Sequence, residues 1–400
     1  MALSGRSSAA PAGAPASRRW LRGLGAVVWW GAAAGPALAV SLLLTGLHAG
    51  PARGTWAPVM PYARAIWFGE HRLVALDSVY RITEAGAPGT FPLSVTGLVL
   101  GAPITVGSWF FWQLAFLAAG AMALCWIVRR CWPRAGGPAV AAGAAALALG
   151  CAPVRSGMQL GTIDLVLLAL MVAGLWPRRP STPVPGLALG LAAAVGIGPI
   201  TAALAAVAGG PGTSSAPMRR RGLITLAVVV LLSGCAFLVA PWNGTDFWVM
   251  LFGGRLGGWP VIDPSLGARA GGAGWVIGAA LLLLALGVAA WAWRHERFSL
   301  GVVAVCLALS IGMPGHWALA GLPALLAGLV ALSSPRLPWR VATLAWAAWT
   351  CLLPIDLVQD KLAWITTMWG WGSAVGAGIL VLLMTIECGG MLRMARPRVS

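Results

Sequence analysis

The chain has 400 residues, of which 59% are hydrophobic and only 9% charged, and its mean hydropathy is +0.84. Soluble domains carry about a quarter charged residues, so this composition excludes a soluble globular domain and indicates a polytopic membrane protein. The net charge of +17 comes from 27 basic and 10 acidic residues. In a membrane protein such an excess of arginine is typical of cytoplasmic loops, and nucleic-acid binding is therefore not expected.

The chain begins with a basic segment, residues 1–22, which predicts a disordered cytoplasmic tail. The long apolar run at residues 23–47 predicts the first transmembrane helix. Because arginines precede this run, its start is expected inside, which places the polar interval at residues 48–91 outside. Many of the 23 tryptophans stand at the ends of apolar runs, as expected for an interfacial belt.

The next apolar segment, residues 92–104, is short for a crossing and is expected to lie in the outer interface or to re-enter. Residues 185–209 are interrupted by the sequence GIGP at 196–199. The further predicted spans are residues 106–128, 138–153, 159–176, 223–240, 274–293, 298–313, 316–332, 341–353 and 373–388.

These spans predict an all-α fold of about 10–12 transmembrane helices, with both termini cytoplasmic. A single transmembrane domain would cover residues 23–390, followed by a cytoplasmic tail at 391–400. A second extracytoplasmic loop is expected at residues 241–272. The seven cysteines form no CxxC pair and mostly lie inside apolar runs, so they are expected to pack rather than to bind metal or form disulfides.

Carboxylates gather in the first outer loop, which holds three of the ten acidic residues, Glu70, Asp77 and Glu84. A carboxylate there could act as a base, and neighbouring arginines could hold a phosphate. We therefore take this acidic cluster, with the arginines beside it, as a candidate site. The arginines expected outside beside these acids are candidate substrate ligands: Arg64, Arg72, Arg81, Arg255 and Arg269. The alternative is that these charges only solvate the loops.

Two further residues are candidates for the substrate site. Asp164 falls in the first turns of a predicted span, near its outer end, and a carboxylate in an apolar run is costly and often functional. Gln159 could be its hydrogen-bonding partner. His316 stands at the outer end of another span and could donate to a phosphate or a sugar hydroxyl, although an interfacial histidine beside Trp317 explains the pattern equally well.

Several short motifs are similar to those of one family, in the same order along the chain. They are Asp77-Ser-Val79-Tyr80-Arg81, Phe91-Pro92-Leu93, Gly161-Thr162-Ile163-Asp164, the glycine-rich stretch 186–199, Asp263-Pro264-Ser265 and His316-Trp317. With this order of segments the chain resembles the GT-C superfamily of membrane glycosyltransferases and, within it, glycosyltransferase family 87. Two departures stand out, because Gly196 occupies the place of the family's lysine and Asp77 lies closer to Phe91 than in the family. Aligning Tyr62 with the family's tyrosine instead puts Pro58 in the place of the catalytic acid.

The resemblance implies a hexosyltransferase of the cytoplasmic (plasma) membrane that acts in cell envelope biosynthesis. It would transfer a hexose, with mannose the expected sugar, from a polyprenyl-phosphate donor to a lipid or glycan acceptor outside the membrane, with inversion. The candidate catalytic base is Asp77 first and Glu70 second, and the resemblance adds Tyr80 and Asp263 to the substrate-binding residues. Its partners would be membrane lipids, the donor and the acceptor, with no metal or other cofactor.

Two alternatives remain open. The first is a transporter or flippase-like protein for an amphiphilic envelope precursor, which predicts charged residues at mid-membrane facing a cavity. The second is a catalytically inactive GT-C homologue that acts as a scaffold.

Overall fold

A computed structural model describes most of the chain, and its secondary structure in this part is helical throughout. The described residues are 16–45, 93–101, 103, 106, 108–159, 163–175, 182–196, 198–209, 216–241, 245–247, 266–312, 317–334, 337, 339–352 and 363–394. Four helices within these ranges are long and apolar enough to cross a membrane, and six shorter apolar segments accompany them. The expectation of an all-α membrane protein is confirmed.

The helices follow the predicted spans closely. In chain order they are α1 (Ala16–Thr45), α3 (Val95–Gly101), α4 (Trp109–Cys131), α5 (Gly137–Gly150), α6 (Ala152–Gln159), α7 (Asp164–Leu175), α8 (Val184–Gly196), α9 (Ile200–Ala208), α10 (Ala216–Val239), α12 (Leu266–Arg294), α13 (Phe298–Gly312), α14 (Trp317–Ser333), α15 (Arg340–Leu352) and α17 (Ala363–Met394).

The boundaries differ from the prediction in a few places. Helix α1 begins within the segment expected as a tail, and α17 extends into the segment expected as the other tail. Helix α12 begins inside the second expected outer loop, and its backbone leaves helical geometry at Ala270 and Gly271. The break at 196–199 separates α8 from α9 as predicted, because glycine and proline interrupt the helix there. Helix α6 was not predicted as a separate element.

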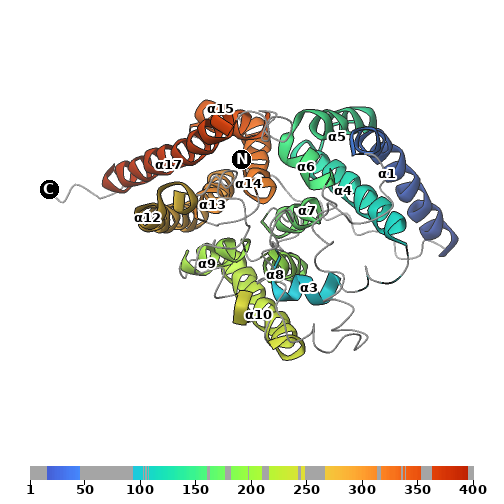
Figure 1. The fold of residues 1–400 in the computed structure, drawn as a ribbon, viewed down its shortest axis with the longest axis horizontal. Helices are drawn as coiled ribbons and strands as arrows, with labels where there is room; N and C mark the ends of the chain where they lie inside the picture. Colours follow the sequence, from blue (N-terminus) through green and yellow to red (C-terminus); the bar gives the residue numbers. More distant parts are fainter. Residues whose placement is uncertain are drawn as a thin grey trace, which may run out of the picture.

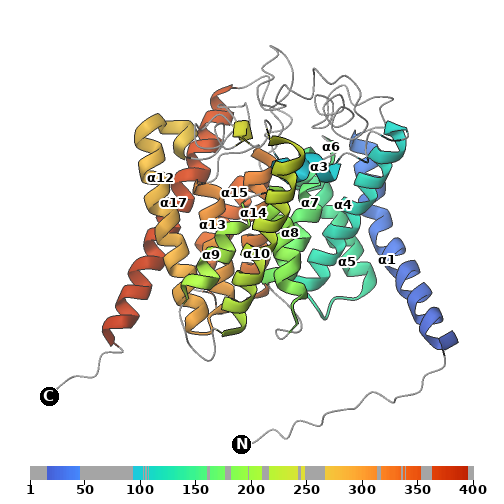
Figure 2. The same ribbon diagram turned by 90° about the horizontal axis from the view of Figure 1, so that it is seen from below.

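The helices form a bundle with two ends (Figures 1 and 2). We call the upper face the end at which α1 and α10 finish and α3 and α7 begin. We call the lower face the end at which α1 begins and α17 finishes. Helices α1, α4 and α5 pack together on one side, α12 with α17 on the other, and α8, α9 and α10 form a third group (Figure 1).

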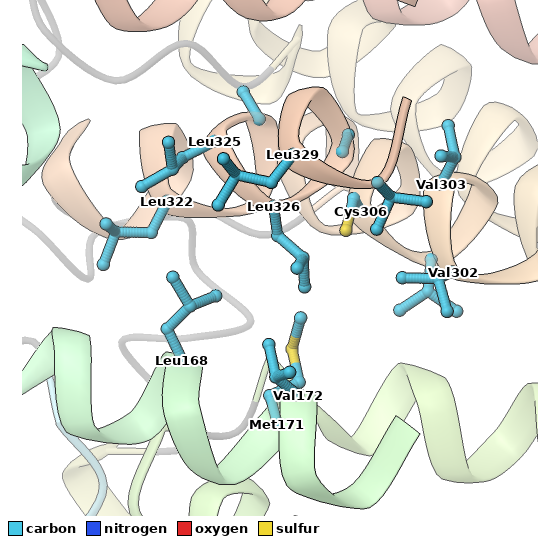
Figure 3. Packing of buried hydrophobic residues seen from close by; sticks show 14 of the residues in the cluster. Leu168, Met171, Val172, Val302, Val303, Cys306, Leu322, Leu325, Leu326 and Leu329 are labelled. Atoms are coloured by element: carbon cyan, nitrogen blue, oxygen red, sulfur yellow. The ribbon is translucent and has the colours of Figure 1, made fainter. Parts of the chain in front are cut away.

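The centre of the bundle is formed by α7, α13 and α14. Figure 3 shows leucine, valine and methionine side chains of α7 facing those of α13 and α14. Residues 300–311 of α13 are buried on every side. A helix that is apolar all round belongs in the interior of a bundle, so α13 is the core element against which the outer helices are arranged.

Glycines allow the closest helix contacts. A Cβ on Gly174 of α7 would lie 2.6 Å from Cβ of Leu189 in α8. A Cβ on Gly190 of α8 would lie 2.6 Å from Cβ of Val228 in α10. Real Cβ atoms do not approach so closely, so these glycines bring the backbones of α7, α8 and α10 together, as small residues do in membrane bundles.

Some tryptophans belong to the core instead of an interfacial belt. Trp293, Trp346 and Trp369 are buried, and the indole of Trp346 donates to the carbonyl oxygen of Ser373 at 2.9 Å. The indole of Trp369 donates to the carbonyl oxygen of Thr350 at 3.2 Å. A buried indole N–H usually finds an acceptor, and here these two donors bind α15 to α17.

Candidate functional site

Most of the predicted site residues lie outside the described part of the chain. They are Glu70, Arg72, Asp77, Tyr80, Arg81, Arg255, Asp263 and His316. Their roles therefore stay predictions. The helices on either side of these residues end or begin at the upper face (Figure 2). The described residues at this face are therefore the ones next to which both polar intervals begin and end.

Asp164 is the predicted site residue whose environment the structure describes. It is the first residue of α7 and is only 2% exposed. This agrees with the prediction that Asp164 lies in the first turns of a span, near its outer end. A negative charge at a helix N-terminus is stabilised by the unpaired N–H groups and by the helix dipole, which lowers the cost of burying it. The side chain of Gln159, its predicted partner, lies outside the described residues.

Arg155 in α6 is a second buried charge at the upper face, and the sequence analysis did not select it. It is 8% exposed, and its Nη1 donates to the carbonyl oxygen of Leu149 in the last turn of α5. A signal was present, because Arg155 is the only charged residue between Arg134 and Asp164. Arginine stays protonated in proteins, so this position keeps a positive charge inside the upper face.

Contacts with α1, α4 and α14 anchor α6, and α4 also contacts the start of α7. A Cβ on Gly120 of α4 would lie 3.4 Å from Leu165 Cδ1 and 3.6 Å from Met158 Cε, so α4 touches both segments. The hydroxyl of Ser41 in α1 donates to the sulfur of Met158. Pro153 of α6 packs tightly against Gly321 of α14. Arg155 and Asp164 are thus carried by two short, well-anchored segments at the same face.

The short helix α3 docks on α8 and α10. The backbone N–H of Ser94 donates to the carbonyl oxygen of Val195 at 2.9 Å, and its hydroxyl donates to the carbonyl oxygen of Ala194. These bonds fix the start of α3 on the end of α8. The segment at 92–104 was predicted to be short and interfacial, and its described helix has seven residues, too few to cross a membrane.

The turn between α8 and α9 contacts the start of α7 and the end of α13. A Cβ on Gly196 would lie 3.2 Å from Leu167 Cδ1 in the first turn of α7, and one on Gly198 would lie 3.0 Å from Leu309 Cδ2 at the end of α13. The fold therefore brings together the starts of α3 and α7 and the α8–α9 turn, three places where family motifs were recognised. Since position 196 is glycine, this turn supplies no cation of its own.

Asp246 is another buried carboxylate that follows the end of α10. It is 6% exposed, beside the buried Phe247. The sequence placed Asp246 in the second polar interval but gave no reason to select it, because the burial of a short helical segment between two long helices has no sequence signature. No group of three potential metal ligands occurs among the described residues.

Arginines concentrate at the opposite end of the bundle. Those with described side chains at the lower face are Arg129, Arg130, Arg134, Arg219, Arg220, Arg221, Arg294, Arg297 and Arg340. Of the acidic residues there, Glu387 forms an ion pair with Arg297 at 3.9 Å. The two faces thus differ in character: one is strongly basic, and the other holds buried charges of both signs.

The fold and this arrangement define an integral membrane protein with a candidate site at one end of its helical bundle. A family model described as glycosyltransferase family 87 matches residues 91–314, more than half of the chain. The chain belongs to glycosyltransferase family 87, and it is a membrane glycosyltransferase by that membership. No curated protein and no solved structure matches it.

Proposed function

We propose that the protein transfers a hexose, with mannose the expected sugar, from a polyprenyl-phosphate donor to a lipid or glycan acceptor at the upper face, and that this face is extracytoplasmic. The orientation is supported by the arginines, because basic residues mark the cytoplasmic side of membrane proteins. Both chain ends would then be cytoplasmic, since α1 begins and α17 finishes at the basic face (Figure 2). The membrane would be the cytoplasmic membrane, and the pathway cell envelope synthesis.

The observation that carries the proposal is the burial of Arg155 and Asp164 at the upper face. Ionisable residues inside a membrane protein are costly and mark functional sites. A guanidinium matches the oxygens of a phosphate through paired N–H donors. A carboxylate nearby can accept from sugar hydroxyls. The pair thus suits a substrate that carries both a phosphate and a sugar.

The reaction would be a single displacement. A carboxylate of the first polar interval, Asp77 or Glu70, takes the proton of the acceptor hydroxyl, and the hydroxyl oxygen bonds to the anomeric carbon. The bond from that carbon to the phosphate oxygen breaks, and the polyprenyl phosphate leaves with the bonding electrons. Configuration is therefore inverted. A well-placed base contributes about 10²–10⁴ in rate.

Arg155 would stabilise the phosphate as its negative charge grows, together with Arg72 or Arg81. Such positioned charges act mainly on the transition state. The lipid tail would lie against the short helix α3, where Leu100 is half exposed. Asp164, Tyr80, Arg255, Asp263 and His316 would bind the sugar or the acceptor.

The test is a transfer assay in membranes containing the full chain, with labelled polyprenyl-phosphate hexose compared with a nucleotide sugar. Transfer is expected from the lipid donor alone. Arg155→Gln should reduce kcat by about 10²–10³, the cost of removing one donor to a developing charge. Arg134→Gln, an exposed arginine of the lower face, is the matched control and should retain wild-type activity. Equal rates for Arg155→Gln and wild type would refute the role of Arg155.

The same assay tests the two alternatives. A transporter needs charges near mid-membrane, whereas Arg155 and Asp164 lie at one end of the bundle, which disfavours that reading. Movement of labelled lipid across vesicles without sugar transfer would support it. A well-expressed wild type that transfers no sugar from any tested lipid donor would support the inactive scaffold.

A further inference from the structure

Arg221 is buried at the lower face although it belongs to a run of three arginines at the start of α10. Arg219 and Arg220 are exposed, as expected for basic residues at a membrane surface, whereas Arg221 is only 3% exposed. Its Nη1 lies 2.9 Å from the sulfur of Met218, three residues earlier. The guanidinium therefore points back toward the N-terminus of α10.

The contacts of this guanidinium are too weak for a buried cation. A thioether sulfur is a weak acceptor, and the Nε–H of Arg221 has no hydrogen-bond partner. Leaving one member of a charged pair buried without its counterpart is strongly destabilising in other proteins. A bound anion would offset this cost through charge-assisted hydrogen bonds.

The surrounding helices supply no such anion. Arg221 lies against α8, because a Cβ on Gly186 would be 3.2 Å from its carbonyl oxygen. The next residue, Gly222, packs against α9, where a Cβ would lie 2.8 Å from the carbonyl oxygen of Ala203. None of the three helices α8, α9 and α10 contains an aspartate or glutamate.

We infer that Arg221 forms, with the N-terminus of α10, a binding site for a phosphate group at the lower face. The phosphate oxygens take the place of the Met218 sulfur and accept from Nη1 and Nε. The planar fork of arginine suits two such bonds, and a helix N-terminus favours an anion. Arg219 and Arg220 attract it from the membrane surface, as basic residues attract anionic lipids. The phosphate can belong to an anionic phospholipid or to a soluble phosphate.

The test compares the thermal unfolding of the full chain in nanodiscs of phosphatidylcholine with and without phosphatidylglycerol. A third sample in phosphatidylcholine receives inorganic phosphate. A ligand that binds the native state raises Tm, through a gain in stability of about 2.7 kcal/mol at a concentration of about 100 Kd. With an unfolding entropy of about 2.1 cal/mol/K per residue, each 1 kcal/mol raises the Tm of this 400-residue chain by about 1 °C. We expect a rise of about 2–4 °C in at least one of the two phosphate-containing samples. A rise in the phosphatidylglycerol sample identifies a lipid, and a rise with inorganic phosphate alone identifies a soluble ligand.

Two variants separate this site from a general effect of surface charge. Arg221→Met replaces the cation with an apolar side chain that fits a buried position and should abolish the rise. Arg220→Met removes an exposed charge of the same run and should keep most of it. If Arg221→Met does not fold, Arg221→Lys takes its place, because lysine keeps the charge but lacks the planar guanidinium. Arg221→Lys should lose at least half of the increase in Tm. The proposal is overturned if wild type shows no rise in either sample, or if the Arg221 variant keeps the full wild-type rise.

Discussion

The backbone N–H of Ser94 and the carbonyl oxygen of Val195 form a hydrogen bond of 2.9 Å that joins the start of α3 to the end of α8. The two residues are far apart in the sequence, and the bond holds α3 on the end of α8, where Gly196 lies against Leu167 in the first turn of α7. A change at Ser94 should therefore affect transfer without altering a charged residue.

Ser94→Pro removes this N–H donor and the hydroxyl that donates to Ala194, so two buried acceptors lose their partners. An unsatisfied buried group costs about 1–3 kcal/mol. We expect lower kcat/KM for the lipid donor and faster proteolysis near residue 94. Ser94→Ala keeps the backbone bond and should show a clearly smaller loss. Equal effects of the two substitutions would show that the backbone bond does not position α3.

The close approach of α8 and α10 at Gly190 predicts a sharp steric effect. Gly190→Val forces side-chain atoms against Val228 and should destabilise the protein by about 1–3 kcal/mol, as overpacked cores do. Tryptophan fluorescence during thermal unfolding in detergent measures the change. Gly234→Ala in α10 meets nothing within 4 Å and should be neutral or stabilising by up to about 1 kcal/mol. A neutral Gly190→Val would contradict the observed packing.

The contact between α15 and α17 depends on buried indoles. Trp369→Phe removes the donor to Thr350 and part of a fully buried side chain. The free energy of unfolding should therefore fall by about 1–3 kcal/mol, which is measured as a lower Tm. Trp364→Phe in the same helix is the control, because Trp364 is 62% exposed and surface substitutions usually change stability by less than about 0.5 kcal/mol. If both variants unfold at the same temperature, the hydrogen bond of Trp369 contributes nothing.

The proposed orientation can be tested by cysteine labelling in intact cells. Six of the seven native cysteines are buried, and Cys235 is exposed. The variant Cys235→Ser therefore lacks an exposed native thiol that would react with the label. In it, Thr245→Cys near the end of α10 should react with a membrane-impermeant maleimide. Gly136→Cys, in the exposed connection between α4 and α5, should react only after permeabilisation. The reverse pattern would place the upper face inside and exclude an extracytoplasmic site.

Features set by local sequence could be predicted, and features set by packing between distant helices could not. The break at 196–199 follows from glycine and proline, and the position of Asp164 at a helix start follows from a carboxylate beside an apolar run. Helix α6 was missed because its eight residues mix polar and apolar types and look like the end of a span. Arg155 was missed for the same reason.

The burial of Trp346 and Trp369 was also beyond the sequence. A tryptophan at the end of an apolar run is typical of the interface, and only the neighbouring helix decides whether it is covered. The docking of α3 on α8 likewise depends on two segments about a hundred residues apart. The assignment of the base to Asp77 or Glu70, in the interval 48–91, stays a prediction.

The most direct test of the central claim is sugar transfer from labelled polyprenyl-phosphate hexose by membranes that carry wild type, Asp77→Asn or Glu70→Gln. Wild type should transfer the sugar with inversion, and at least one of the two variants should lose about 10²–10⁴ in kcat, the contribution of a general base. Glu296→Gln at the exposed lower-face turn should behave as wild type. Full activity in both Asp77→Asn and Glu70→Gln would contradict a mechanism in which a carboxylate of this interval is the base.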